Sequence, residues 1–150
     1  MNTNDTINRV KYLMSGYNFE SITKTGELNT FPGVKIQLKE GQKKIAETHL
    51  VDISVAKNLE TNVVSLTESN LIGDEKCIYL YGFKIEESYR GLGYGKKLLK
   101  ECLNSSSDLG YNRISLMVLS ENTIARNLYT KNGFRYVAEV NDNIYLEKIL

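Results

Sequence analysis

The chain has 150 residues, a formal net charge of +1 and 41% apolar residues, which suits a single domain, residues 1–150, that buries its own core. Because 19 basic residues are balanced by 18 acidic ones, the charge predicts neither a nucleic-acid partner nor an anionic-membrane surface. No apolar run approaches the length of a membrane span, and the N-terminus carries no apolar signal segment, so we expect a cytoplasmic protein.

Residues that bind metals or take part in redox chemistry are few. The sequence has two cysteines, Cys77 and Cys102, no C-x-x-C pair and one histidine, His49. A zinc site needs about four ligands at recognisable spacing, so no metal is predicted. We expect all three residues to be structural, with the cysteines as small core residues of a reducing compartment.

The N-terminal half gives the weakest signals. Residues 7–13 suggest a short helix, and residues 19–28 are polar. Pro32 lies in T-F-P-G, which is typical of a turn. From Val34 to Ser54 apolar and polar residues alternate around E-G-Q-K, which predicts an antiparallel hairpin. Residues 55–75 fit either a strand or a helix.

Two buried strands are predicted in the centre of the chain. C-I-Y-L-Y-G-F-K-I, residues 77–85, is nearly continuous in aromatic and β-branched residues, as a central strand should be. Gly82 interrupts it, and a lone glycine within a strand indicates a bulge or a close approach of another group to the backbone. I-S-L-M-V-L, residues 114–119, is the next strand. About 27 residues separate the two, enough for a helical crossover, so we expect the strands to be parallel.

Two helices and a hairpin complete the prediction. Apolar residues between 98 and 103 recur at helical spacing, and this helix is expected to end near Gly110. N-T-I-A-R-N-L-Y-T-K-N-G-F predicts a second helix, capped by Asn122 and ended by Asn132-Gly133. The two strand-like runs that flank N-D-N, residues 141–143, predict a closing hairpin.

The glycine-rich stretch R-G-L-G-Y-G-K-K, residues 90–97, lies between the first central strand and the helix. A helix N-terminus presents unpaired N–H groups and the positive end of the macrodipole, and glycines let an anion approach them closely. Arg90, Lys96 and Lys97 add positive charge. The stretch therefore predicts an anion site, although glycines can also serve only to shape a tight turn.

The spacing of this stretch excludes two common phosphate loops. Gly91, Gly93 and Gly95 are spaced G-x-G-x-G, whereas dinucleotide sites require G-x-G-x-x-G. The triphosphate loop needs Ser or Thr after its Gly-Lys pair, but here Lys97 follows Lys96. A phosphate-loop nucleotide-binding protein therefore stands only as a secondary alternative.

A third motif fits. R-G-L-G-Y-G matches the [RQ]-x-x-G-x-[GA] loop of the GNAT superfamily of acyl-CoA-dependent N-acetyltransferases. The segment I-S-L-M-V-L-S-E-N-T-I-A-R-N-L-Y-T-K-N-G-F resembles the strand and the N-x-x-A-x-x-L-Y-x-K-x-G-F signature that follow in that family. The resemblance covers about residues 77–138, which would form the cofactor-binding core. It implies an α/β (α+β) fold with a mixed, mostly antiparallel central sheet, helices on both faces and a splayed parallel pair at the centre.

The resemblance also implies acetyl-CoA as the cosubstrate and gives roles to individual residues. Backbone amides of the loop should hold the pyrophosphate, and the residues concerned are Arg90, Gly91, Leu92, Gly93, Tyr94, Gly95 and Lys96. The strand end at Phe83 and Ile85 should pair with the pantetheine arm in the gap between the splayed strands. Asn122 should hydrogen-bond the cofactor. Tyr129 should lie beside the thioester sulfur and protonate the departing thiolate.

The implied reaction is direct attack of a primary amine on the acetyl carbonyl in a ternary complex. A backbone N–H near Ile85 should stabilise the oxyanion. The base that deprotonates the ammonium is left open among a water chain and four side chains, Glu86, Glu87, Tyr79 and Tyr81.

The partner is expected to be a small-molecule or peptide amine, and a homodimer is compatible with the family. Residues 1–75 depart from the family pattern of one strand and two helices, so the acceptor wall is not predicted. The main alternative to an enzyme is a non-catalytic acyl-CoA-binding module of the same fold.

Overall fold

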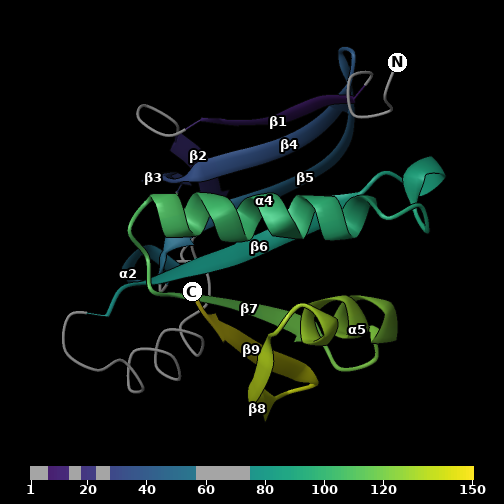
Figure 1. Ribbon diagram of the computed structural model, residues 1–150. Helices are drawn as coiled ribbons and strands as arrows, with labels where there is room; N and C mark the ends of the chain where they lie inside the picture. The colour runs from purple at the N-terminus through teal and green to yellow at the C-terminus, as the bar shows by residue number, and fades with distance from the viewer. Residues whose placement is uncertain (1–6, 14–17, 23–27, 57–74) are drawn as a thin grey trace.

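The computed structural model describes residues 7–13, 18–22, 28–56 and 75–150, which include a 7-stranded sheet of order β1-β4-β5-β6-β7-β9-β8 (Figure 1). Within this sheet β6 and β7 are parallel, and the other neighbouring pairs are antiparallel. The strands are β1 (Ile7–Leu13), β4 (Val34–Glu40), β5 (Lys43–Asp52), β6 (Cys77–Ile85), β7 (Arg113–Leu119), β8 (Arg135–Val140) and β9 (Asn143–Ile149). The predicted mixed, mostly antiparallel sheet with a central parallel pair is confirmed.

The expectation of a short helix over residues 7–13 was wrong. Strand β1 pairs antiparallel with β4, from Ile7 opposite Glu40 to Leu13 opposite Lys35. The apolar residues Ile7 and Val10 have helical spacing, but β4 offers an unpaired edge whose backbone groups need partners. Pairing with this edge outweighs the weak local preference.

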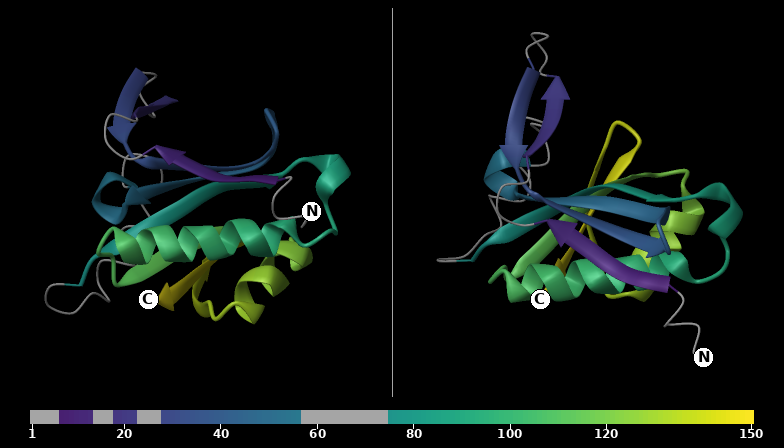
Figure 2. Two further views of the ribbon diagram at one scale, coloured as in Figure 1. Left: turned by 45° about the horizontal axis from the view of Figure 1, so that its top comes forward. Right: turned by 90° about the horizontal axis from the view of Figure 1, so that it is seen from above.

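A separate two-stranded hairpin lies in the chain between β1 and β4 and was not expected from its polar sequence. It consists of β2 (Asn18–Ile22) and β3 (Leu28–Pro32), and Figure 2 shows it standing off from the main sheet. The turn expected at T-F-P-G was wrong for its first three residues, because β3 runs through Pro32; β4 begins at Val34, so the chain passes from one sheet to the other at Gly33. Most of the ambiguous segment 55–75 lies outside the described residues.

The helices cover the two faces of the sheet unequally. α4 (Tyr94–Asp108) and α5 (Thr123–Lys131) contribute Leu98, Leu99, Cys102 and Tyr129 to the larger core cluster (Figure 1). The opposite face has a smaller cluster, to which the short α2 (Ile53–Ala56) contributes. Its members are Val51, Ile53, Ala56, Cys77, Tyr79 and Tyr145. Both faces therefore carry helical residues, as predicted.

Strand β6 contains the bulge that the glycine within it predicted. In the β5–β6 ladder His49 lies opposite Tyr81 and Glu47 opposite Lys84, so β6 has one residue more than β5 between these pairs. The backbone at Gly82 has φ of +64°, which favours glycine.

Beyond the bulge, each side chain of β6 points to the opposite face of the sheet from the one that a regular strand would give it. Tyr81 packs against the smaller cluster, on the face opposite α4, whereas Phe83 packs against the larger cluster. In a regular strand residues two apart share a face. The buried Thr48 stabilises the irregular backbone, since its hydroxyl donates to the carbonyl of Tyr81 at 2.9 Å.

The helix ends and the last turn follow the predicted signals. The Asn122 side chain caps α5, and Gly133 follows its end with φ of +93°. Gly110 follows α4 with φ of +88°. Asn141 and Asp142 join β8 to β9 with positive φ values, as a tight hairpin requires.

The described part of the chain lacks two kinds of feature. None of its helices has the length and apolar character needed to cross a membrane. It also contains no group of three or more His, Cys, Asp or Glu residues that could hold a metal ion.

The two cysteines give a testable consequence of burial. Cys77 and Cys102 are both free and buried, and burial raises the pKa of the Cys77 thiol to about 11 and that of Cys102 further. Since the thiolate is the reactive form, the folded protein should react with a thiol reagent at pH 8 at least about 100-fold more slowly than the unfolded chain. Rates of the Cys77→Ser and Cys102→Ser variants would assign each thiol. A fast-reacting thiol in the folded protein would contradict this packing.

Candidate functional site

The parallel strands β6 and β7 separate at the centre of the sheet. Their pairing runs from Cys77–Arg113 to Leu80–Leu116, although β6 continues to Ile85 and β7 to Leu119. The separation lies where the family resemblance implies a gap for the pantetheine arm. The second half of β6 therefore pairs with β5 along one edge only, and its other edge borders the gap.

The end of β6 presents backbone groups to this gap. Glu86 donates its N–H to the carbonyl of Ile45 at 2.8 Å, on the β5 side. Because successive residues of a strand direct their N–H groups to opposite edges, the N–H of Ile85 is directed toward the gap. The Ile85 carbonyl already accepts a hydrogen bond from Nε of Arg90 at 2.9 Å. A ligand in the gap would therefore meet the N–H of Ile85 together with the guanidinium of Arg90.

The glycine loop leaves the first turn of α4 open. Gly91 and Gly93 have φ values of +77° and +88°, a region that side-chain-bearing residues rarely adopt. Gly93 is the N-cap, and no side chain caps the helix. The N–H of Lys97 donates to the carbonyl of Gly93 at 3.3 Å. Residues 94–96 precede it, so their N–H groups lie at the positive end of a 15-residue helix, as an anion site requires.

Gly95 has a different purpose from the other two loop glycines. A Cβ at this position would lie 3.2 Å from Cδ2 of Leu128 and 4.0 Å from Cε1 of Phe83. The missing side chain therefore allows α4, α5 and β6 to meet closely at one point. This contact places the open end of α4 next to the gap, because Phe83 lies on the part of β6 that faces it.

Tyr129 lies at the same meeting point. Its side chain is 4% exposed and makes edge-on ring contacts with Phe83 and Phe134, each with centroids 5.7 Å apart. Burial raises its pKa above the ordinary value, so the phenol is neutral at physiological pH. Within the described residues its hydroxyl makes no hydrogen bond. A neutral, uncommitted phenol next to the gap is chemically suited to donate a proton.

The remaining residues predicted to bind the cofactor are a helix cap and two exposed side chains. The Asn122 side chain accepts a hydrogen bond from the N–H of Ala125 at 3.2 Å, so it is a helix cap, and its role toward a cofactor stays a prediction. Leu92 is 66% exposed on the loop, and Lys96 is exposed on the first turn of α4.

A row of two aromatic rings with an ammonium group at each end borders the loop and was not predicted. Tyr89 and Tyr94 meet edge-on, with centroids 5.7 Å apart. Nζ of Lys43 lies 5.2 Å from the Tyr89 centroid, and Nζ of Lys97 lies 5.5 Å from the Tyr94 centroid. The row ties the β4–β5 turn to the start of α4. No sequence pattern predicts this row of side chains, because Lys43 reaches the loop only through the pairing of strands that are distant in sequence.

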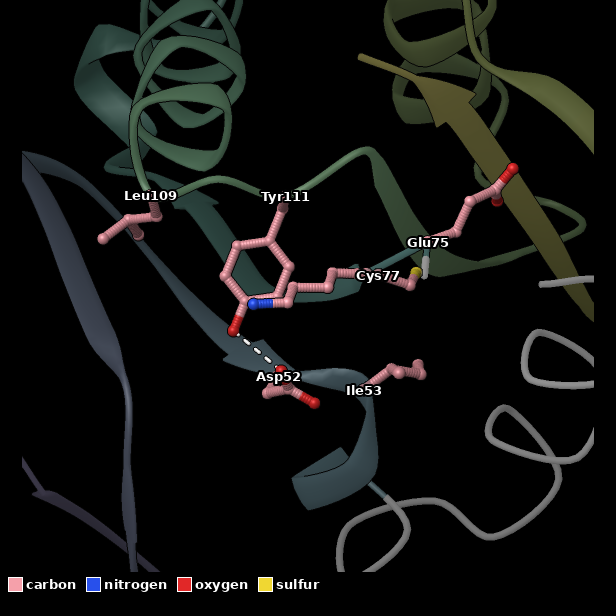
Figure 3. Close-up of a pocket in the computed structure, with 7 residues that line it drawn as sticks. Asp52, Ile53, Glu75, Cys77, Leu109 and Tyr111 are labelled. Atoms are coloured by element: carbon pink, nitrogen blue, oxygen red, sulfur yellow. Dashed lines mark hydrogen bonds between the residues drawn. The ribbon is translucent and has the colours of Figure 1, made fainter. Parts of the chain in front are cut away.

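The pocket shown in Figure 3 lies elsewhere in the fold. It has a volume of about 270 Å³ and is lined by Asp52, Ile53, Glu75, Lys76, Cys77, Leu109 and Tyr111. The Tyr111 hydroxyl donates to the Asp52 carboxylate across it at 2.8 Å. Cys77 begins β6, whereas the glycine loop follows its end, about 25 Å away at the usual strand rise. This cavity is therefore not part of the gap site.

The side chains predicted as possible general bases differ in burial and in the face of the sheet on which they lie. Tyr79 is 3% exposed and stacks on Tyr81, and both lie on the face opposite α4. Glu87 is exposed in the single 3₁₀ turn that follows β6. Sequence reasoning treated His49 as structural, but the structure places it beside the bulge. The available signal was E-T-H, because two-residue spacing puts Glu47 and His49 on one face of a strand.

Comparisons with known proteins agree with this geometry. Residues 29–134, more than half of the chain, match the family model described as the acetyltransferase (GNAT) family. An uncharacterised N-acetyltransferase, YycN of Bacillus subtilis, is 37% identical over 57 residues, which are 38% of this chain and 36% of that protein. The spermine/spermidine N(1)-acetyltransferase of Bacillus subtilis is 36% identical over 67 residues, 44% of each chain. The chain thus matches less than half the length of both curated relatives.

A solved structure supports the fold at lower sequence similarity. The crystal structure of Arabidopsis thaliana NAA60 in complex with acetyl-CoA superposes with a TM-score of 0.58 at 19% identity. The match covers 79% of this chain and 76% of that one. The two proteins therefore share a fold.

Proposed function

The chain belongs to the acetyltransferase (GNAT) family, and from that premise we propose that it is an N-acetyltransferase that moves an acetyl group from acetyl-CoA to a primary amine. One observation carries the proposal. The uncapped N-terminus of α4, the unpaired edge of β6 and the hydroxyl-bearing ring of Tyr129 converge at the gap between β6 and β7. An anion site beside a slot for an extended chain suits a diphosphate that carries a long, thin arm.

In this proposal the loop residues bind acetyl-CoA. The N–H groups of residues 91–96 hold the pyrophosphate, and Arg90 and Lys96 add positive charge. The backbone of Phe83 and Ile85 pairs with the pantetheine arm, with Arg90 already seated on the Ile85 carbonyl. Asn122 lies at the α5 end of the site and hydrogen-bonds the cosubstrate. These assignments extend the described contacts to a bound molecule.

The proposed reaction is direct attack of the amine on the acetyl carbonyl in a ternary complex. A backbone N–H of β6 that faces the gap, near Ile85, stabilises the negative charge that develops on the carbonyl oxygen. The neutral hydroxyl of Tyr129 protonates the departing thiolate. The acceptor is a small-molecule or peptide amine, and a protonated amine with a pKa of about 10 must first lose a proton.

We also propose that residues 1–150 form one domain with a cofactor-binding core at about residues 77–138, which the family match over residues 29–134 supports. A homodimer is compatible with this proposal.

Acetylation of an amine panel tests the proposed function. The panel contains a polyamine, an aminoglycoside, free amino acids and peptides with either a free N-terminus or a lysine. We expect at least one member to release free CoA thiol and gain an acetyl group by mass spectrometry. Protein that binds acetyl-CoA but acetylates no member would favour a non-catalytic acyl-CoA-binding module instead.

A further inference from the structure

The single histidine of the chain lies directly over the bulge in β6. His49 is opposite Tyr81 in the β5–β6 ladder, and the two rings stack with centroids 5.1 Å apart and an interplanar angle of 20°. A Cβ on Gly82 would lie 3.1 Å from Cδ2 of His49. The glycine therefore both forms the bulge and leaves room for the imidazole.

This position on β6 is close in the chain to the closed end of the gap. Gly82 comes two residues after Leu80, the last residue of β6 that pairs with β7. An acyl-pantetheine arm that enters from the α4 end would place its acyl group toward this closed end. Tyr129 contacts Phe83 on the helix-covered face, whereas His49 and Tyr81 lie on the opposite face. A phenol and an imidazole would then flank the acyl group from the two faces of the sheet.

The charges around His49 keep it neutral but ready to accept a proton. Burial lowers its pKa below 6.5, and Lys35 of β4 and Lys44 of β5 lower it further. Glu47 of β5 acts in the opposite direction, with Oε2 3.8 Å from Nε2 of His49. Tyr81 of β6 supplies the stacked ring. The imidazole is therefore uncharged at pH 7, with a carboxylate at hand to stabilise the imidazolium.

We propose that His49 is the general base of the acetyl transfer, an inference that rests on the proposed function. The imidazole removes one proton from the attacking ammonium, and the nitrogen lone pair forms the C–N bond. As the C–S bond breaks, the Tyr129 hydroxyl gives its proton to the thiolate. The surplus proton on the new amide nitrogen returns to the Tyr129 oxygen, and the imidazolium releases its proton to solvent. The net reaction liberates one proton.

The wild-type protein allows a direct test, because one histidine gives one set of imidazole NMR signals. The His49 pKa would be measured by NMR with saturating acetyl-CoA, and kcat/KM for an alkylamine acceptor would be measured from pH 5 to 9. Neutral His49 acting on the ammonium predicts that kcat/KM rises with pH and levels off above the His49 pKa. Attack by free amine without His49 predicts a tenfold rise per pH unit with no break there.

Two variants and a control sharpen the test. His49→Gln should lower kcat/KM about 100-fold or more and remove the break, with acetyl-CoA binding unchanged by calorimetry. Glu47→Gln should lower the NMR pKa and the kinetic break by the same amount, because the carboxylate raises the His49 pKa. Glu139→Gln, at an exposed position on β8, is the matched control and should change neither quantity.

The outcomes separate this inference from the proposed function. If wild-type protein acetylates no amine, the proposed function fails and the role of His49 fails with it. If wild-type protein transfers acetyl groups but His49→Gln keeps the break, only the role of His49 is overturned. Should His49→Gln fail to fold, Glu47→Gln decides, since a kinetic break that does not follow the NMR pKa also overturns the role.

Discussion

Replacing Tyr129 with phenylalanine should lower kcat about 100- to 10,000-fold and leave the affinity for acetyl-CoA unchanged. The phenol ring packs between Phe83 and Phe134, and phenylalanine keeps these ring contacts. Only the hydroxyl is removed, and with it the proposed proton donor to the thiolate. Steady-state kinetics with the acceptor found in the amine panel, together with calorimetry of acetyl-CoA, would measure both effects.

The same substitution has a useful consequence for stability. Because the Tyr129 hydroxyl makes no hydrogen bond within the described residues, its loss should change the free energy of unfolding by less than about 1 kcal/mol. A large loss of activity without a loss of stability would therefore reflect chemistry and not misfolding. Full activity of the Phe variant would show that the thiolate gains its proton elsewhere.

The second large effect is expected at the ion-pair network behind β7 and β9. Arg113 and Glu147 are each 4% exposed, and Nη1 of Arg113 lies 3.2 Å from Oε2 of Glu147. Nη2 of Arg113 also contacts Glu75 at 2.7 Å, and Nη2 of Arg135 contacts Glu147 at 2.9 Å. Glu147→Gln removes the carboxylate that contacts both arginines. The buried guanidinium of Arg113 then keeps only one of its two carboxylate partners, Glu75. We expect the free energy of unfolding to fall by about 3 kcal/mol.

Chemical denaturation would measure this loss, again with Glu139→Gln as the exposed control. A double variant, Arg113→Met with Glu147→Leu, should recover most of the stability, because it removes both buried charges together. The remaining partners, Glu75 and Arg135, are partly exposed and can be solvated. A Glu147→Gln variant as stable as the control would show that the network contributes little.

The predictions that succeeded rest on local pattern. Cys77–Ile85 forms the expected strand and holds the middle place in the sheet, because a continuous apolar run is stable only where both faces are covered. Asn122 and Gly133 mark the ends of α5, since capping depends on neighbouring residues alone. Gly82 predicted the bulge for the same local reason.

The failures rest on distant partners. The sequence of residues 7–13 suggests a helix, but the edge of β4 makes it a strand. Lys43 and His49 have no motif of their own. They become relevant only because the register of β5 against β6 places one beside Tyr89 and the other over Gly82. Register follows from the packing of the whole sheet, which a single sequence does not display.

The central claim is that the loop before α4 and the gap between β6 and β7 form a site for acetyl-CoA. Calorimetric titration of the wild-type protein with acetyl-CoA and, separately, with ATP tests it most directly. The account predicts saturable binding of acetyl-CoA at a stoichiometry of one per chain and much weaker binding of ATP. Tight binding of ATP without binding of acetyl-CoA would contradict it and would favour a nucleotide-binding protein.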